Sequence, residues 1–415
     1  MKSVNTIVCC FAATVCAWSA DAVPELSDVM LYQGNGRTVK FSYVLSGESA
    51  VVTARFIDAT TGDYLPDDQV KTFVGAVNRV VHPSATPKEG AWKAGKDCPG
   101  RFFDVRLELT AWSEAEPPLY MDVDLATGET TYHCTTNSLP APIGSDAAKT
   151  THLVLRRIPQ TAPTGFFLGD NANPSTCATV HVTRPFYLAI YEFTQGQTHT
   201  VFGDTWLPAK LSEVSTMDPD WLGDKKPVTG WENYRLRGYG LWPTNDTAGL
   251  TPVGSHGLVS RMRELTGLAF NLPTEAQWEY ACRAGSTGKY PWGDSASPAV
   301  AAKYAFVNLG TAAAHPQEIG LLEPNAWGLY DMIGNVGEMT LTYYVDAYWT
   351  ATDYVDPRGP DETTMRSYVS RGYGYSGWWA ATTCFGRSST DGASVSMGFR
   401  LCCNPTPWED VVEVP

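Results

Sequence analysis

The chain has 415 residues, enough for two or three domains, and its 43% hydrophobic and 18% charged residues exclude an intrinsically disordered chain. A formal net charge of −14 and a pI near 4.9 exclude a protein that binds nucleic-acid backbones through a basic surface. The 14 Trp, 20 Tyr and 37 Gly indicate a fold held by aromatic packing and tight turns rather than by long helices.

The first 22 residues have the pattern of a signal peptide. Lys2 gives a positive start, residues 7–18 are mostly apolar, and Ala20-Asp21-Ala22 is a small-x-small cleavage pattern. About a dozen apolar residues are too few to span a bilayer, and no later segment is long and apolar enough. We therefore expect an exported protein, periplasmic, cell-surface or secreted. Removing Cys9, Cys10 and Cys16 from the ten cysteines leaves seven, an odd number.

Residues 24–136 have the pattern of short strands. Apolar and polar residues alternate over 39–45, 103–109 and 119–125, and turns rich in Gly and Asp separate such runs. This pattern predicts a small all-β sandwich that serves as a spacer or adhesion module. Its two cysteines, Cys98 and Cys134, are disulfide candidates. Residues 137–150, rich in Pro, Ser and Ala, are predicted to be a linker.

From residue 151 onward, strand-like pieces alternate with Gly and Pro turns up to residue 403. Only two stretches are predicted to be helical. One covers residues 258–266. The other begins after Thr274, which forms a plausible capping box with Gln277. The last segment, residues 404–415, is predicted to be a loosely held tail.

Four sequence blocks in this region carry a family resemblance. They read RIP, FLG and PFYLAIYEFT at 157–159, 167–169 and 185–194; NLPTEAQWEYACRAG and YPWGD at 271–285 and 290–294; NAWGLYDMIGNVGE at 325–338; and RG, RS and GFR at 371–372, 387–388 and 398–400. Residues 152–403 thereby resemble the formylglycine-generating enzyme, or sulfatase-modifying factor, family. The resemblance implies an α+β domain with little regular structure, a variant of the C-type-lectin fold.

The active members of that family hold copper between two cysteines, just before the closing RS and GFR motifs. The resemblance aligns Cys384 with the second cysteine and places Trp379 where the first would stand, so half of the copper pair is present. Copper(I) is soft and prefers thiolate ligands. Cys384 is thus either a catalytic, metal-binding thiol or a structural cysteine. An iron site is not expected, because the seven His are scattered along the chain.

The resemblance also implies a disulfide and two calcium sites. Cys282 resembles a family cysteine whose bridge partner follows the GFR motif, which here means Cys402 or Cys403. At the first implied calcium site the ligands are the Asp331 and Glu338 side chains and the carbonyls of Gly334 and Val336. At the second they are Asn308 and the carbonyl of Leu309. Calcium takes six to eight hard oxygens. The loop at 310–320 lacks the Asp of the second site. Alternatively, Asp331 and Glu338 are solvated or bind loop backbone.

Three functions follow from these features. The first is a copper-dependent oxidoreductase of the formylglycine-generating type, which oxidises a protein cysteine and has a sulfatase as partner. The second is a non-catalytic, calcium-stabilised binding or scaffold module. It would recognise a peptide or glycan through an aromatic groove made of Tyr373, Tyr375, Trp378, Trp379 and Arg387. The third is a calcium-stabilised surface protein whose sandwich domain makes the contact.

Overall fold

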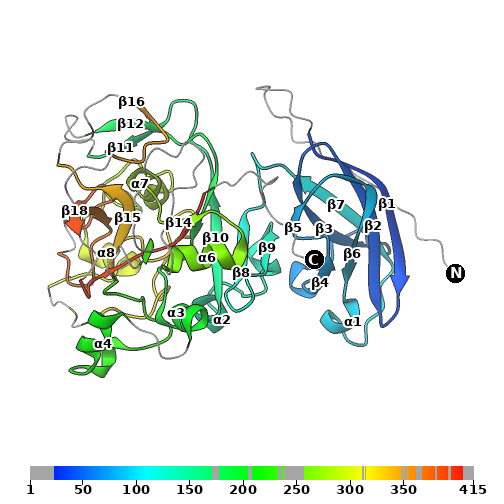
Figure 1. Cartoon of the computed structure of the whole chain (residues 1–415), viewed down its shortest axis with the longest axis horizontal. Helices are drawn as coiled ribbons and strands as arrows, with labels where there is room; N and C mark the ends of the chain where they lie inside the picture. The colour runs from blue at the N-terminus through cyan, green and yellow to red at the C-terminus, as the bar shows by residue number, and fades with distance from the viewer. Residues whose placement is uncertain are drawn as a thin grey trace. The chain divides into compact units, whose positions relative to one another are not determined.

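The protein folds into two compact units, which the computed structural model describes in most of their length (Figure 1). The first unit comprises residues 23–122 and 130–143, and the second comprises 123–129 and 144–404. The described residues are 23–170, 177–203, 208–231, 236–237, 257–310, 313, 315–346, 349, 353–360, 367–378, 381–390 and 394–404. The predicted signal peptide and tail lie outside them, except for residue 404.

The first unit contains two antiparallel sheets that share one hydrophobic core. Phe41, Tyr43 and Leu45 of one sheet and Val52 and Phe56 of the other are all buried in it, as the alternating pattern predicts. The order in the first sheet is β1 (Glu25–Gly34), β2 (Thr38–Ser46), β6 (Ser84–Trp92), β4 (Phe73–Gly75), and in the second β5 (Arg79–Val81), β3 (Ala50–Asp58), β7 (Val105–Trp112).

Short elements complete this part of the chain. They are η1 (Asp67–Gln69), α1 (Ala94–Asp97), β8 (Tyr120–Asp124), β9 (Thr130–His133) and η2 (Thr136–Ser138). The segment predicted as a linker is ordered: it includes the end of η2 and the helix α2 (Asp146–Thr150). The Ser145 side chain caps α2 by accepting a hydrogen bond from the Ala148 N–H.

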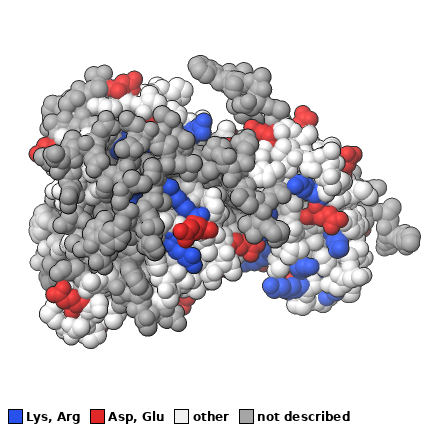
Figure 2. Space-filling model, in the orientation of Figure 1, with Lys and Arg blue, Asp and Glu red and all other residues white. Residues whose placement is uncertain are grey.

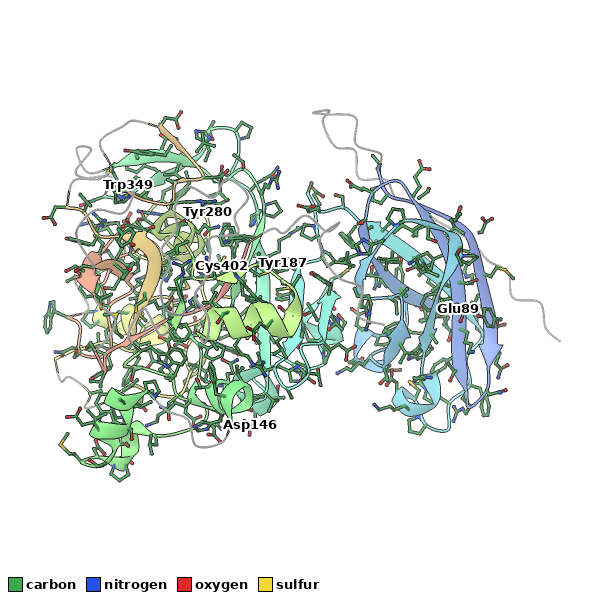
Figure 3. The ribbon with its side chains drawn as sticks, viewed as in Figure 1. Glu89, Asp146, Tyr187, Tyr280, Trp349 and Cys402 are labelled. Carbon is green, nitrogen blue, oxygen red and sulfur yellow. The ribbon has the colours of Figure 1, made fainter. Side chains whose placement is uncertain are left out.

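The second unit is built on three sheets. In this unit the strand order of the first sheet is β14 (Phe270–Asn271), β20 (Cys402–Cys403), β13 (Phe186–Ala189), β10 (His152–Ile158). The order of the second sheet is β18 (Arg387–Thr390), β17 (Tyr368–Arg371), β15 (Gly337–Tyr343), β19 (Met397–Gly398). The order of the third sheet is β11 (Phe166–Leu168), β12 (Ala178–His181), β16 (Asp353–Val355). In the first of these sheets Tyr187 pairs with Cys403 and Leu188 with Cys402; Tyr187 and Cys402 are labelled in Figure 3.

Both predicted helices of this unit are confirmed. They are α6 (Leu258–Thr266) and α7 (Glu275–Arg283), and α7 has the expected capping box of Thr274 and Gln277. The prediction of only two helices was wrong, because α3 (Gln195–Phe202), α4 (Ala209–Ser215), η4 (Pro219–Trp221) and α8 (Pro298–Tyr304) also form. A second capping box, Thr194 with Gln197, begins α3. Since α3 has few apolar residues, it leaves no helical period to detect.

The fold is therefore mixed α+β, with many short strands and few helices, as expected. Among the helices of the described residues, none combines the length and the apolar character that crossing a membrane requires. On the described parts of the face in Figure 2, basic and acidic side chains are interspersed rather than gathered into a basic stripe.

Candidate functional site

Cys384 lies beside another cysteine in the interior of the second unit. Its Sγ is 3.6 Å from the Sγ of Cys282, the penultimate residue of α7, and both side chains are completely buried. The Cys384 N–H donates to the Lys289 carbonyl, and the Cys384 carbonyl accepts from the Arg371 guanidinium, so backbone contacts fix the segment. The neighbour of Cys282 is thus Cys384, and not Cys402 or Cys403 as the resemblance implied.

The other cysteines make separate contacts. Cys402 and Cys403 lie on β20, where their Sγ atoms contact the Asn404 side-chain oxygen and carbonyl at 3.5 and 3.8 Å. In the first unit the Cys98 Sγ donates to the Gln69 carbonyl, and Cys134 is half-buried. None of the seven described cysteines is joined in a disulfide. Cys282 and Cys384, whose sulfurs are 3.6 Å apart, are the two that are close enough to form one.

Copper fits this cysteine pair poorly. Burial raises the pKa of Cys282 well above its ordinary value, and the adjacent Cys384 raises it further. A thiolate is the form that binds copper, and a buried apolar setting disfavours it. Both cysteine side chains are also completely buried. In the described part of the chain, no three His, Cys, Asp or Glu side chains are grouped to hold a metal ion.

A network of buried charges surrounds the same helix. Glu275 and Glu279 of α7 are fully buried and both bind Arg371 Nη2, at 2.7 and 3.0 Å. Arg283 binds Glu279 at 2.7 Å, and Arg387 binds Glu275 at 2.8 Å. Two carboxylates therefore face three guanidinium groups, and every charge has a partner. Buried charges persist in this form because the alternative, an unpaired buried charge, costs several kcal/mol.

The sequence had suggested that Arg387 lines an open groove. In the structure it belongs to this network of buried charges. Its guanidinium lies over the Tyr344 ring, 4.8 Å from the centroid, and also donates to the Val345 carbonyl. Its side chain is therefore held on several sides. The pairing of Arg387 with Glu275 could not be predicted from the sequence, because the two residues are 112 positions apart.

The loop for which calcium was predicted leads into β15. Gly334 has φ of +86°, and a Cβ there would lie 2.4 Å from the Phe306 carbonyl oxygen, so only glycine fits the turn. Asp331 is buried and its Oδ2 accepts from the Gly320 N–H. Glu338 is bound by Arg400, with contacts of 2.6–2.9 Å, and by the Trp278 indole N–H at 2.7 Å.

A third carboxyl group, which the sequence did not single out, adjoins this loop. Glu192 is completely buried; it accepts hydrogen bonds from the Asn335 side chain and the Val336 N–H. Burial raises the pKa of Glu192 well above its ordinary value and that of Asp331 to about 6, and the acidic neighbours raise both further. If all three carboxyls ionised, Arg400 and the nearby Lys149 would leave a net charge of about −1, which a bound cation would offset. The three carboxyls are nevertheless not grouped as ligands of one metal ion among the described residues.

The second implied calcium site is less well formed. The Asn308 side-chain oxygen accepts from the Gly310 N–H at 2.9 Å, and the Asn308 N–H donates to the Gly377 carbonyl. Leu309 is 38% exposed. The Asn308 side chain thus binds its own turn.

Trp221 packs against His315 and Tyr375, and the name aromatic surface is used for these three residues together with the exposed Trp378 of the predicted groove. Trp221 is at its centre, with ring centroids 6.0 Å from Tyr375 and 6.5 Å from His315. Trp378 is 54% exposed, whereas Tyr375 is buried. Trp379 lies outside the described residues. Tyr373 has φ of +54°, a left-handed conformation uncommon for a residue with a side chain. Sequence motifs had not indicated Trp221 or His315.

Comparison with known proteins gives consistent similarities. The family described as "Sulfatase-modifying factor enzyme 1-like domain" matches residues 158–405. The formylglycine-generating enzyme of Streptomyces coelicolor is 30% identical over 212 residues, 46% of this chain and 66% of the relative. The inactive Cα-formylglycine-generating enzyme 2 of Mus musculus is 32% identical over 156 residues, 34% of this chain and 45% of the relative.

The chain therefore spans less than two thirds of either curated relative. Among solved structures, Treponema denticola variable protein 1 aligns with a TM-score of 0.46 and 20% identity, over 63% of this chain and 97% of that one.

Proposed function

Because residues 158–405 match its domain, the chain belongs to the sulfatase-modifying factor family, and we propose that it is a non-catalytic binding module of that family. One observation carries the proposal. The cysteine that could serve as the catalytic thiol, Cys384, is packed against Cys282 in the closed interior. A buried cysteine of this kind acts as a structural element, because reactive cysteines lie in partly exposed, electropositive settings.

The ligand would bind the aromatic surface in the second unit, whose fold we take to be C-type-lectin-like. Trp378 is 54% exposed, whereas Trp221 is buried and makes edge contacts with the His315 and Tyr375 rings. Two charged groups lie next to these rings: Lys226 Nζ is 3.5 Å from His315 Nδ1, and an Asp220 oxygen is 3.9 Å from His315 Nε2. Aromatic faces with flanking polar groups suit a peptide or a glycan.

Calcium is proposed as a stabilising ion rather than a reactive one. Asp331 and the carbonyls of Gly334 and Val336 would hold it, with Glu338 and Glu192 completing the negative surroundings. Its role would be to neutralise the buried carboxyls beside Arg400, as the raised pKa of Asp331 suggests. The second set, Asn308 and Leu309, is not included, since the Asn308 oxygen is engaged locally. Export by the N-terminal signal peptide is likewise part of the proposal.

The decisive test supplies copper and oxygen to the purified chain with a peptide that carries a sulfatase-type cysteine motif. We expect no stoichiometric copper binding and no aldehyde in the peptide. Cys177→Ser is a matched control for Cys384→Ser, because Cys177 is also buried and its Sγ donates to a carbonyl. Aldehyde formation that Cys384→Ser abolishes and Cys177→Ser leaves intact would establish the oxidase and overturn the proposal.

A glycan array and a peptide array then probe the binding function itself. The expected result is a ligand whose binding Trp378→Ala reduces about tenfold or more, a size typical of an aromatic residue at the centre of an interface. Trp112→Ala serves as the control, because that indole lies in the first unit and donates to Thr53. If every ligand bound by the chain is unaffected by Trp378→Ala, the aromatic surface is not the binding site.

A further inference from the structure

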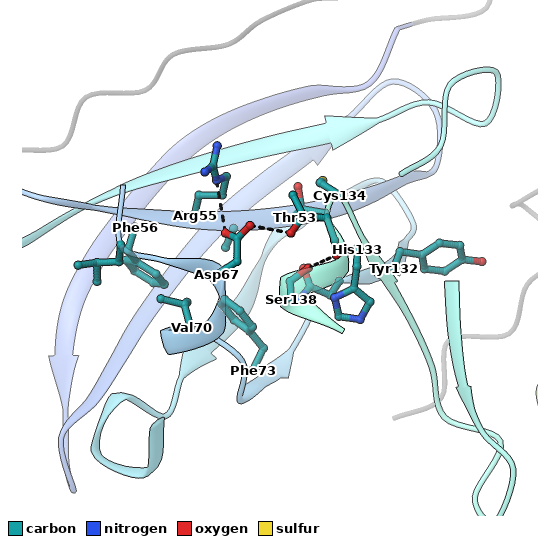
Figure 4. A pocket seen from close by; sticks show the side chains of 14 residues that line it. Thr53, Arg55, Phe56, Asp67, Val70, Phe73, Tyr132, His133, Cys134 and Ser138 are labelled. Atoms are coloured by element: carbon teal, nitrogen blue, oxygen red, sulfur yellow. Dashed lines mark hydrogen bonds and ion pairs between the residues drawn. The ribbon is translucent and has the colours of Figure 1, made fainter. Parts of the chain in front are cut away.

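A small pocket in the first unit is independent of the site described above (Figure 4). It has a volume of about 80 Å³ and lies between β3, η1, β4 and the turn that follows β9. Phe56, Val70 and Phe73 give it an apolar floor, and Arg55 and Asp67 lie at its polar side. The two sheets of the sandwich leave this space at one end of their shared core.

One buried polar atom in the pocket wall has no partner. His133 is only 4% exposed, and its Nε2 is 2.9 Å from the Thr131 hydroxyl. Its Nδ1 is buried and finds no hydrogen-bond partner among the described residues. Buried polar atoms are nearly always satisfied, so such an atom calls for a group that the described residues do not supply. In Figure 4 the ring lies beside Ser138.

The pocket is suited to an uncharged group. Burial lowers the pKa of His133 to about 3, so the imidazole is neutral. The Asp67 carboxylate is already satisfied, with the Thr135 hydroxyl at 2.7 Å and Arg55 Nε at 3.9 Å. Arg55 in turn lies 3.7 Å above the Tyr64 ring centroid. Neither an anion nor a cation would find an unpaired counter-charge here, and the apolar floor would oppose either.

Size narrows the choice further. A cavity of about 150 Å³ accommodates a benzene ring, so 80 Å³ suits a group about half as large, of three or four heavy atoms. The group must have an apolar end for Phe56 and Phe73 and a hydrogen-bonding end for a neutral imidazole. An acetamido group meets both needs, since it joins a methyl group to an amide N–H and C=O.

We propose that this pocket binds the acetamido group of an N-acetylated sugar. The methyl group contacts the aromatic floor, and the amide pairs with His133 Nδ1. The sugar ring remains outside at the mouth, where Asp67 and Arg55 offer polar contacts to its hydroxyls. This site is separate from the aromatic surface, and it does not depend on the non-catalytic role proposed for the second unit.

The test compares two sugars that differ only in the acetamido group. Saturation-transfer NMR on the full chain is run with N-acetylglucosamine, with glucose, and with an N-acetyl-lysine peptide. We expect transfer to the N-acetyl methyl of the first sugar and none to glucose. His133→Leu, which fills the same space without a polar atom, should weaken binding about tenfold or more, as expected for one lost buried hydrogen bond. His82→Leu, at the histidine bound to Ser49, should leave binding unchanged.

A second variant covers the case in which His133→Leu does not fold. Ser138→Leu places an apolar side chain from η2 at the pocket and should abolish binding by occupying it. Three results would overturn the proposal: no transfer to N-acetylglucosamine at millimolar concentration, equal transfer to glucose, or binding of the N-acetyl-lysine peptide alone.

Discussion

The interior around α7 and the aromatic surface around Trp221 belong to the same unit but differ in construction. In the interior, two buried carboxylates bind three arginines, of which Arg387 is partly exposed, and two buried cysteines lie side by side. On the aromatic surface, the Trp378 indole is more than half exposed. The long sequence blocks that identify the family contribute mainly to the interior. They therefore account for the fold, whereas the aromatic surface is the place proposed for ligand binding.

The largest effect is expected at the cysteine pair. Cys282 and Cys384 are 102 residues apart, and a disulfide closing a loop of that length adds about 4–5 kcal/mol in the chain-entropy model. Cys384→Ala should lower the free energy of unfolding of the oxidised protein by about that amount, measured in urea. Cys177→Ala is the control and should cost less. A wild-type protein whose stability a reducing agent leaves unchanged would contradict this prediction.

The charge network should show a loss of similar or slightly smaller size. Arg371→Met removes the guanidinium shared by Glu275 and Glu279, which keep only Arg387 and Arg283, and breaking a buried ion pair costs up to about 3–5 kcal/mol. Arg261→Met is the control, because its pair with Glu264 is half exposed and is worth about 0–1 kcal/mol. Equal losses in the two variants, measured by urea denaturation, would mean that the network does not stabilise the interior.

The carboxyl group of Asp331 predicts a pH dependence in the absence of calcium. Its folded-state pKa, about 6, is above the ordinary value of 3.8, so the folded protein binds a proton that the unfolded chain has lost. The resulting stability is present below pH 4 and disappears as the pH rises through 6. The difference between these two pKa values corresponds to about 3 kcal/mol.

Urea denaturation between pH 4 and 7.5 in a chelator measures this effect. The wild type should lose up to about 3 kcal/mol more than Asp331→Asn over that range, because only the wild type must ionise the buried Asp331 carboxyl. Added calcium should reduce the difference by taking the place of the proton. If the free energy of unfolding changes with pH in the same way in the two proteins, Asp331 ionises normally. If calcium does not shift the urea midpoint of unfolding, the protein does not bind calcium at this loop.

The smallest stability effect is expected on the aromatic surface. Trp378→Ala should change the free energy of unfolding by no more than about 0.5 kcal/mol, because exposed positions away from the core tolerate substitution. Its effect belongs to ligand binding instead. A loss above about 2 kcal/mol would place Trp378 in the packed structure and weaken the contrast with the interior.

The sequence was informative where the signal is local. The alternation of Phe41, Tyr43 and Leu45 gave a strand of the sandwich, and Thr274 with Gln277 gave the start of α7. The left-handed turn at Gly334 also follows from a local motif.

It was uninformative where distant segments meet. The placement of Cys282 beside Cys384, the capture of Arg387 by Glu275, and the grouping of Trp221 with His315 and Tyr375 depend on contacts across about a hundred residues, which leave no periodic signal. Glu192 was missed for the same reason, since its partners Asn335 and Val336 are more than 140 residues away.

The state of Cys384 in the native protein tests the central claim most directly. The chain is purified without reductant, treated with an alkylating reagent under native conditions, and digested for peptide mass spectrometry. The account predicts that the Cys384 peptide remains unalkylated and is recovered linked to the Cys282 peptide. Rapid alkylation of Cys384 in the folded protein, with copper(I) protecting it, would instead identify an accessible metal-binding thiol and contradict the proposal of a non-catalytic module.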